Sequence, residues 1–339
     1  SHSLKRNYRS KGYTDMEKKA TRDSYGEALV MLAEKRPDLV VLDADLAAAT
    51  KTGIFKKAHP DRFFDCGIAE ANMMGVAAGI ASTGKLVFAS SFAMFAAGRA
   101  FEIVRNSIGY PHLNVKIGAT HAGISVGEDG ASHQCNEDIA LMRSIPGMTV
   151  INPADDVEAK AAVLAMADYV GPTYMRFGRL AAPIFNDAAT YKFEVGKGIQ
   201  LKDGKDVTII ATGLMVSEAL EAAKALKEQG VDARVINIHT IKPIDREAIL
   251  KAVMETRRII TVEDHNVSGG LGSAVAEVVV ESGKGCAFKQ LGIQDKFAPI
   301  GLHEDIMSML GIDSNGIVDA VREVMGKDFE LDDDWDDEV

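Results

Sequence analysis

The sequence has 339 residues, of which 47% are hydrophobic, and its mean hydropathy is close to zero. This length and composition exclude a wholly disordered chain and are sufficient for two domains of about 100–200 residues each. The net charge of −11 is concentrated at the end of the chain, where eight of the last twelve residues are acidic, and it disfavours nucleic-acid binding.

The chain begins with a polar stretch, residues 1–19, which we expect to be a disordered or artificial leader. It lacks the apolar segment of a secretory signal, and no apolar run of about 18 residues occurs in the sequence. The three cysteines, Cys66, Cys135 and Cys286, have no C-x-x-C spacing, which disfavours a disulfide framework or a zinc site. These features predict a cytoplasmic protein without a membrane partner.

Helical and strand-like segments alternate over residues 20–190. The hydrophobic pattern predicts helices over residues 24–34, 69–83 and 92–107, and strands over residues 39–43, 87–91, 115–119 and 149–151. A repeated order of strand and helix is typical of a parallel, doubly wound sheet, so we expect an α/β domain here.

An irregular stretch, residues 180–198, contains the turn-forming residues Pro183, Asn186, Asp187, Gly196 and Gly198 and precedes a second alternating region. In that region strands are predicted over residues 207–211, 233–238 and 258–262, and helices over residues 216–229, 246–256 and 272–282. We therefore expect a second, smaller α/β domain over residues 195–325, followed by a disordered acidic tail over residues 326–339.

Two of the three stretches suited to chemistry have simple structural explanations. Glu70 begins a helix of small residues, where an acid interacts favourably with the helix dipole. Phe92 and Phe95 follow a predicted strand, where aromatic rings either pack in the core or support a flat cofactor ring.

The third stretch, residues 120–134, contains His121, His133, two adjacent acids and several glycines. Such a loop cannot form a core, and it follows an apolar strand, where open α/β sheets bind their ligands. The histidines are twelve residues apart and the adjacent acids would point apart, so a metal site is disfavoured. The loop favours a site that hydrogen-bonds a sugar or a cofactor.

Five motifs occur in one order along the chain: G-I-A-E-A-N-M-M-G, S-F-A-M-F, T-H-A-G-I, G-E-D-G-A-S-H-Q and I-N-P-A-D. Together they resemble the pyrimidine-binding half of transketolase, and the following region resembles the transketolase C-terminal domain. The resemblance covers residues 20–325 and implies two doubly wound α/β domains, with the pyrimidine-binding domain over residues 20–190. The motifs resemble transketolase more than deoxyxylulose-phosphate synthase or the β subunits of 2-oxoacid dehydrogenases.

The resemblance implies thiamine diphosphate as the cofactor, but no Gly-Asp-Gly signature of the diphosphate-binding half occurs in the sequence. It therefore implies one subunit of a split transketolase of the pentose phosphate type, which moves a two-carbon ketol unit between sugar phosphates. A partner chain would bind the diphosphate and its Mg²⁺ or Ca²⁺, in a heterotetramer. Two alternatives stay open: a subunit of another thiamine-diphosphate enzyme, or a non-catalytic scaffold.

The resemblance assigns four residues to the cofactor. Glu70 matches the acid that hydrogen-bonds a pyrimidine ring nitrogen, and Phe92 matches the aromatic ring that stacks on the pyrimidine, with Phe95 behind it. Asp45 in D-A-D-L matches a residue near the thiazolium side.

Other matches concern the sugar. His121 and His133 match the histidines that contact the ketose oxygens and move protons, and Asp129 matches an acid that recognises a sugar hydroxyl. Arg22 and Arg179 match arginines that hold a sugar phosphate.

Three positions complicate these assignments. Arg176 competes with Arg179 as the phosphate ligand. Gly98 stands where many transketolases have a third aromatic residue, and Ala49 stands where the family often has a phosphate-binding serine. These departures predict a less enclosed pyrimidine pocket and rearranged phosphate contacts.

A glycine-rich turn, residues 263–272, precedes a predicted helix of the second domain. Such a turn can cradle a phosphate, but this one lacks a full G-x-G-x-x-G pattern. A structural turn is favoured.

Overall fold

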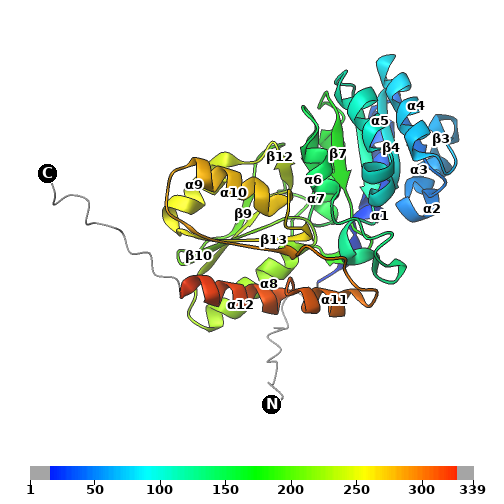
Figure 1. Ribbon diagram of the computed structural model, residues 1–339. Coiled ribbons are helices and arrows are strands. Elements are labelled where there is room, and N and C mark those ends of the chain that lie inside the picture. The colour runs from blue at the N-terminus through cyan, green and yellow to red at the C-terminus, as the bar shows by residue number, and fades with distance from the viewer. Residues whose placement is uncertain (1–15, 327–339) are drawn as a thin grey trace.

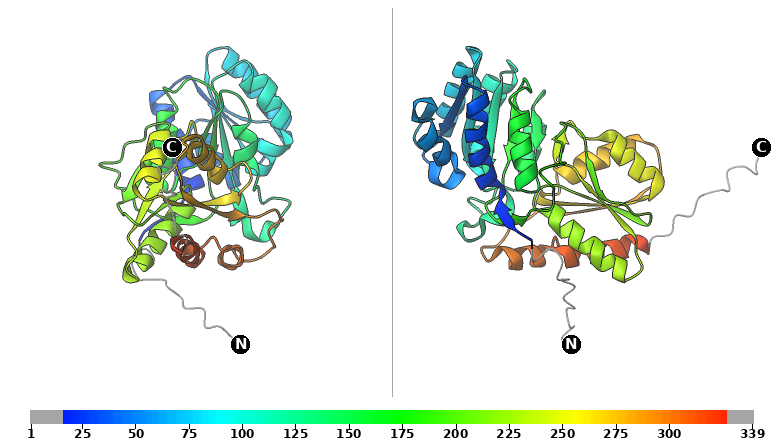
Figure 2. Two further views of the ribbon diagram at one scale, coloured as in Figure 1. Left: turned by 60° about the vertical axis from the view of Figure 1, so that its left-hand side comes forward. Right: turned by 180° about the vertical axis from the view of Figure 1, so that it is seen from behind.

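The computed structural model describes residues 16–326, which form two α/β units lying side by side (Figures 1 and 2). The predicted leader and acidic tail lie mostly outside the described residues, although Lys18 and Lys19 belong to a short strand. In chain order the elements are β1 (Lys18–Ala20), α1 (Thr21–Lys35), β2 (Leu39–Asp43), α2 (Ala47–Thr50), α3 (Thr52–Ala58), η1 (Pro60–Arg62), β3 (Phe63–Asp65), α4 (Glu70–Ser82), β4 (Leu86–Phe92), η2 (Met94–Arg99), α5 (Phe101–Ile103), η3 (Val104–Gly109), β5 (Val115–Thr120), η4 (Gly123–Asp129), α6 (Asp138–Arg143), β6 (Thr149–Ile151), α7 (Asp156–Ala165), β7 (Thr173–Arg176), β8 (Ala181–Pro183), β9 (Ile199–Lys202), β10 (Val207–Ala211), α8 (Met215–Glu228), β11 (Ala233–Asn237), β12 (Thr240–Lys242), α9 (Arg246–Glu255), β13 (Arg258–Asn266), α10 (Leu271–Glu281), β14 (Ala287–Ile293), α11 (His303–Leu310) and α12 (Ser314–Met325).

The first sheet has seven strands in the order β12-β6-β7-β5-β4-β2-β3. All neighbouring strands run parallel except the edge strand β12, which is antiparallel to β6. Successive side chains of β2 lie on opposite faces of the sheet and belong to different hydrophobic clusters. Leu39 and Val41 pack with α1 and α7, whereas Val40 and Leu42 pack with α4 and η2. Because a strand buried on both faces is predominantly apolar, the apolar run that ends at Asp43 is recognisable as a strand from the sequence. The predicted doubly wound sheet is confirmed.

The second sheet has five strands in the order β14-β13-β10-β11-β9, of which only the edge strand β9 is antiparallel to its neighbour. Val207 and Ile209 pack with α8 and α12 on one face, while Ile210 packs with α9 and α10 on the other. This unit is therefore also covered by helices on both faces, as its alternating sequence predicts.

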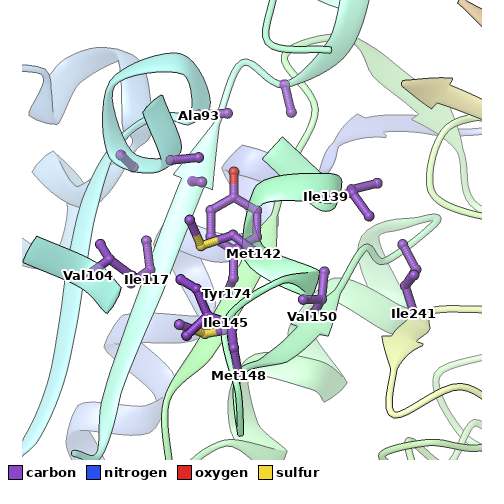
Figure 3. Packing of buried hydrophobic residues seen from close by; sticks show 14 of the residues in the cluster. Ala93, Val104, Ile117, Ile139, Met142, Ile145, Met148, Val150, Tyr174 and Ile241 are labelled. Carbon is purple, nitrogen blue, oxygen red and sulfur yellow. The ribbon is translucent and has the colours of Figure 1, made fainter. Parts of the chain in front are cut away.

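Strand β12 joins the two units, a connection that the sequence pattern does not reveal. It follows β11 of the second sheet but pairs antiparallel with β6 at the edge of the first, with Thr240 opposite Ile151. Ile241 is 1% exposed and belongs to the same apolar cluster as Val150 and Ile139, which lie near it in Figure 3. The two units therefore share one hydrophobic core.

The predicted helix over residues 92–107 is not a continuous α-helix. Phe92 ends β4, and the segment that follows consists of two π-helical turns, η2 and η3, around the short α5. Within the first of these turns Gly98 lies close to Met94, since an added Cβ would lie 2.6 Å from the terminal methyl of Met94. Periodicity alone does not distinguish such a turn from an α-helix, although π turns occur frequently at functional sites.

Candidate active site

The candidate site residues gather at the carboxyl edge of the first sheet. Asp45 follows β2, Glu70 begins the helix after β3, Phe92 ends β4 and His121 follows β5. Since β3, β2, β4 and β5 are parallel neighbours, these positions lie at the same edge, where open α/β sheets bind ligands.

Glu70 has a buried carboxylate with an unsatisfied oxygen. The residue is 2% exposed, and its Oε2 has no hydrogen-bond partner among the described residues. Nη1 of Arg99 lies 3.5 Å from this oxygen, close enough for an ion pair but without hydrogen-bond geometry. A buried carboxylate oxygen without a donor is costly, so this position suits a ligand that brings a nitrogen donor.

Four aromatic side chains lie together beside this edge. The Phe92 ring stacks on His121 with 3.9 Å between ring centroids and on Phe95 with 6.0 Å. His133 meets both phenyl rings edge-on, at 6.4 Å from Phe92 and 5.5 Å from Phe95. The structure thus brings together the predicted aromatic pair and both predicted histidines.

His121 is held in one orientation by two hydrogen bonds. Its Nε2 lies 2.9 Å from Nη1 of Arg22, and its Nδ1 lies 2.8 Å from Oγ1 of Thr120. Because a guanidinium can only donate, Nε2 accepts and the ring proton lies on Nδ1. Burial, the largest cause, and the positive charges of Arg22 and Arg179 together lower the pKa of His121 to about 3, so the ring is neutral at physiological pH.

The second domain holds the loop that carries His121. Oδ1 of Asp264, at the end of β13, accepts a hydrogen bond of 2.9 Å from the backbone N–H of Ile124. Gly123 has a φ of +72°, and a Cβ there would lie 2.1 Å from the carboxylate of Asp264. Only glycine therefore fits between this loop and the second domain. The sequence offers no signal for this contact, because 140 residues separate Asp264 from Ile124.

The three arginines considered for phosphate binding differ in their surroundings. Arg176 is 4% exposed, and its Nε donates to Asp138 at 2.8 Å while its Nη2 donates to the carbonyl of Asp264 at 2.7 Å. Arg22 is half-buried and donates to the carbonyl of Ala49 at 3.1 Å, and half-buried Arg179 donates to the carbonyl of Val126 at 2.5 Å. Arg176 is thus engaged in the domain junction, whereas the other two lie near His121.

Two predicted residues lie further out. Asp129 is exposed at the end of η4. Asp45 is exposed with a φ of 63°, and its backbone N–H donates to Asp65 at 3.0 Å. Both side chains are therefore accessible to a ligand.

The glycine-rich turn of the second domain is structural, as predicted. The carboxylate of Glu263 accepts the backbone N–H groups of Leu271 at 2.7 Å and Gly272 at 2.8 Å, at the start of α10. The carboxyl group of Glu263 thus already occupies the position that a phosphate would take.

Neither a group of metal ligands nor a membrane-spanning helix occurs in the part of the chain that the structure describes. Between residues 16 and 326, no three His, Cys, Asp or Glu side chains converge into a group that could hold a metal ion. Over the same range, no helix combines the length and the apolar character needed to cross a bilayer.

Comparison with known proteins identifies the family. A family model described as the pyrimidine-binding domain of transketolase matches residues 17–184, and one described as the transketolase C-terminal domain matches residues 196–317. The putative transketolase C-terminal section of Methanocaldococcus jannaschii is 50% identical, over 91% of this chain and 98% of that protein. An apulose-4-phosphate transketolase subunit of Phocaeicola vulgatus is 38% identical, over 91% of this chain and 98% of that protein.

A longer relative and a solved structure also belong to the transketolases. Human transketolase is 39% identical over 92% of this chain, which corresponds to 50% of the human protein. A solved structure described as a split gene transketolase, inactive beta4 tetramer, is 49% identical with a TM-score of 0.82, over 90% of this chain and 98% of that one. The chain therefore belongs to the transketolase family and contains its pyrimidine-binding and C-terminal domains.

Proposed function

We propose that this chain is the C-terminal subunit of a split, thiamine-diphosphate-dependent transketolase that transfers a two-carbon ketol unit between sugar phosphates. The observation that carries this proposal is the buried, unsatisfied Oε2 of Glu70 at the same sheet edge as the stacked pair Phe92 and His121. Two relatives of similar length, in Clostridium sp. and in Phocaeicola vulgatus, are named as transketolase subunits, which supports a subunit role here.

The proposed enzyme is active only with a partner subunit. No Gly-Asp-Gly occurs in the sequence, and the described residues contain no group of metal ligands, so the diphosphate and its Mg²⁺ or Ca²⁺ are assigned to the partner. The solved relative described as an inactive tetramer of one chain type supports both self-association and dependence on a second chain. We therefore propose a heterotetramer of two copies of each subunit.

Four residues of this chain would hold the cofactor's pyrimidine side. When bound, thiamine diphosphate supplies a carbon nucleophile that also accepts the electrons released by carbon–carbon cleavage. Glu70 would use Oε2 for a hydrogen bond with a pyrimidine ring nitrogen, and Phe92 offers an apolar face with Phe95 beside it. Asp45 is exposed at the neighbouring strand end, in keeping with a role nearer the thiazolium.

The sugar contacts are assigned to the loop after β5. Neutral His121 presents Nε2 as a proton acceptor, and Arg22 holds that nitrogen until a substrate hydroxyl replaces it. His133 is half-buried beside the phenyl rings, and exposed Asp129 would receive a sugar hydroxyl. For the sugar phosphate we favour Arg22 and Arg179 over Arg176, which Asp138 already neutralises.

We also propose the domain division expected from the sequence, with residues 20–190 as the pyrimidine-binding domain and residues 195–325 as the C-terminal domain. The separation of the two sheets supports it, because β8 ends at Pro183 and β9 begins at Ile199. Strand β12 crosses this division.

The test combines the purified chain with its diphosphate-binding partner, thiamine diphosphate and Mg²⁺, and measures ketol transfer from a ketose phosphate to an aldose phosphate. Glu70→Ala should reduce the rate by more than about a hundredfold, as loss of a group that acts on a transferred proton does. Glu102→Ala removes an exposed acid of α5 and should leave the rate unchanged. Undiminished transfer by Glu70→Ala would reject the role of Glu70.

The same mixture separates the alternatives. Pyruvate decarboxylation without ketol transfer would identify a subunit of another thiamine-diphosphate enzyme. Full turnover by the partner alone would identify a scaffold.

A further inference from the structure

Arg99 covers two of the groups assigned above to the pyrimidine ring. Its Nη1 lies 3.5 Å from Oε2 of Glu70, and its guanidinium carbon lies 5.2 Å from the centroid of the Phe95 ring. The Glu70 side chain is 2% exposed and the Arg99 side chain is 59% exposed. A largely solvated cation thus lies over a buried carboxylate and an aromatic face.

The chemistry of this contact is the chemistry expected of the ligand. A guanidinium is flat, carries N–H donors and stacks on aromatic rings. An aminopyrimidine is also flat, carries nitrogen donors and stacks. Arg99 therefore makes the kinds of contact with Glu70 and Phe95 that the ring would make, while Oε2 of Glu70 still lacks a hydrogen bond that a better-placed donor could supply.

We propose that Arg99 occupies the pyrimidine site of the free chain, and that the cofactor's pyrimidine ring binds by displacing it from Glu70 and Phe95. This inference rests on the proposed function, because it takes Glu70 and Phe95 as pyrimidine-binding residues.

The local fold allows such a displacement. In the π turn η2 the N–H of Ala100 bonds to the carbonyl of Phe95 at 3.1 Å, and this wide turn places Arg99 beside Phe95. A hollow of about 640 Å³ opens next to the pair, with Met94, Arg99 and Phe297 in its wall. The guanidinium can move into this hollow without breaking a buried hydrogen bond, since its contact with Glu70 is an ion pair with an exposed partner.

The experiment measures binding of 4-amino-5-hydroxymethyl-2-methylpyrimidine, the pyrimidine half of thiamine, to the purified full chain by calorimetry. Arg99→Ala and Arg99→Gln should each bind this probe about three- to tenfold more tightly than the unaltered chain, the range set by one exposed cation–π contact and one weak ion pair. Arg105→Ala, which removes an exposed arginine from the neighbouring turn η3, should leave the affinity unchanged. Glu70→Gln should weaken binding.

Thermal unfolding of the free chain gives a second reading. Arg99→Ala should lower the melting temperature, because it leaves the buried Glu70 carboxylate without its cation, and the loss should be smaller when Arg99→Ala is made in a Glu70→Gln background. Equal or weaker probe affinity in both Arg99 variants, with binding still dependent on Glu70, would overturn displacement and leave the proposed function intact. If Glu70→Gln left the probe affinity unchanged, Glu70 would not belong to a pyrimidine site. That result would reject both the proposed cofactor site and this inference.

Discussion

His121 shows how one side chain acquires its chemical state from its neighbours. It is 3% exposed, and Arg22 donates to its Nε2 while Thr120 fixes its Nδ1. Burial and the arginine charges both disfavour the imidazolium, so the pKa falls to about 3. The sequence indicates that both histidines lie in a polar loop. It does not indicate the tautomer of His121, because the residue that fixes it, Arg22, is 99 residues away along the chain.

Arg22→Gln should raise the pKa of His121, since it removes a neighbouring positive charge. The value should stay below the ordinary 6.5, because burial, the larger cause, persists. NMR titration of the His121 ring protons measures this, and Arg36→Gln, which removes an arginine paired with Asp38 at the far end of α1, should have no effect. An unchanged pKa in Arg22→Gln would contradict the assigned contact.

The same shift has a consequence for stability with a defined sign. The unfolded histidine binds a proton near pH 6.5, whereas the folded one binds it only near pH 3, so the unfolded state gains more protons between these values. The contribution of His121 to stability is therefore present above pH 6.5 and is lost as the pH falls towards 3. Arg22→Gln should narrow this pH range by raising its lower limit, because the variant raises the pKa of folded His121.

Among the structural elements, strands were predicted better than the helix that follows Phe92. The predicted bounds of β2 and β10 are correct, because a buried parallel strand is a short, predominantly apolar run. The segment 92–107 has helical periodicity, but its two π turns place Arg99 beside Phe95, a contact that an α-helical reading does not anticipate. The pairing of β12 with β6 and the contact of Asp264 with Ile124 depend on tertiary structure, which local pattern does not encode.

The loop after β5 depends on β13 of the other domain, and this dependence is testable. In the proposed two-subunit enzyme, Asp264→Ala should lower kcat by about ten- to hundredfold, because the freed N–H of Ile124 lets the His121 loop shift and small misplacements are costly. Asp264→Asn retains an acceptor oxygen for Ile124 and should lose less. Faster hydrogen exchange of the Ile124 amide in Asp264→Ala, with KM changed less than kcat, would indicate positioning. Equal exchange in the two variants would contradict it.

At the scale of the whole molecule, the shared core predicts that the two α/β units unfold together. Ile241 of β12 is 1% exposed and packs in the cluster that contains Val150 of the first sheet and Ile210 of the second. Ile241→Ala should cost about 2–5 kcal/mol of unfolding free energy, because it removes a fully buried side chain and leaves a cavity. Ile54→Ala in α3, where the side chain is 39% exposed, should cost less than half as much.

Calorimetry distinguishes a shared core from two cores that merely touch. If β12 couples the units, Ile241→Ala lowers the temperature of a single transition, because residues of both sheets lose packing at once. If the units were independent, each would unfold in its own transition. The substitution would then lower the temperature of only one transition and leave the other unchanged. Such coupling would explain how Asp264 can position the His121 loop. A carboxylate of the second domain holds a loop of the first only if the two sheets do not move relative to each other.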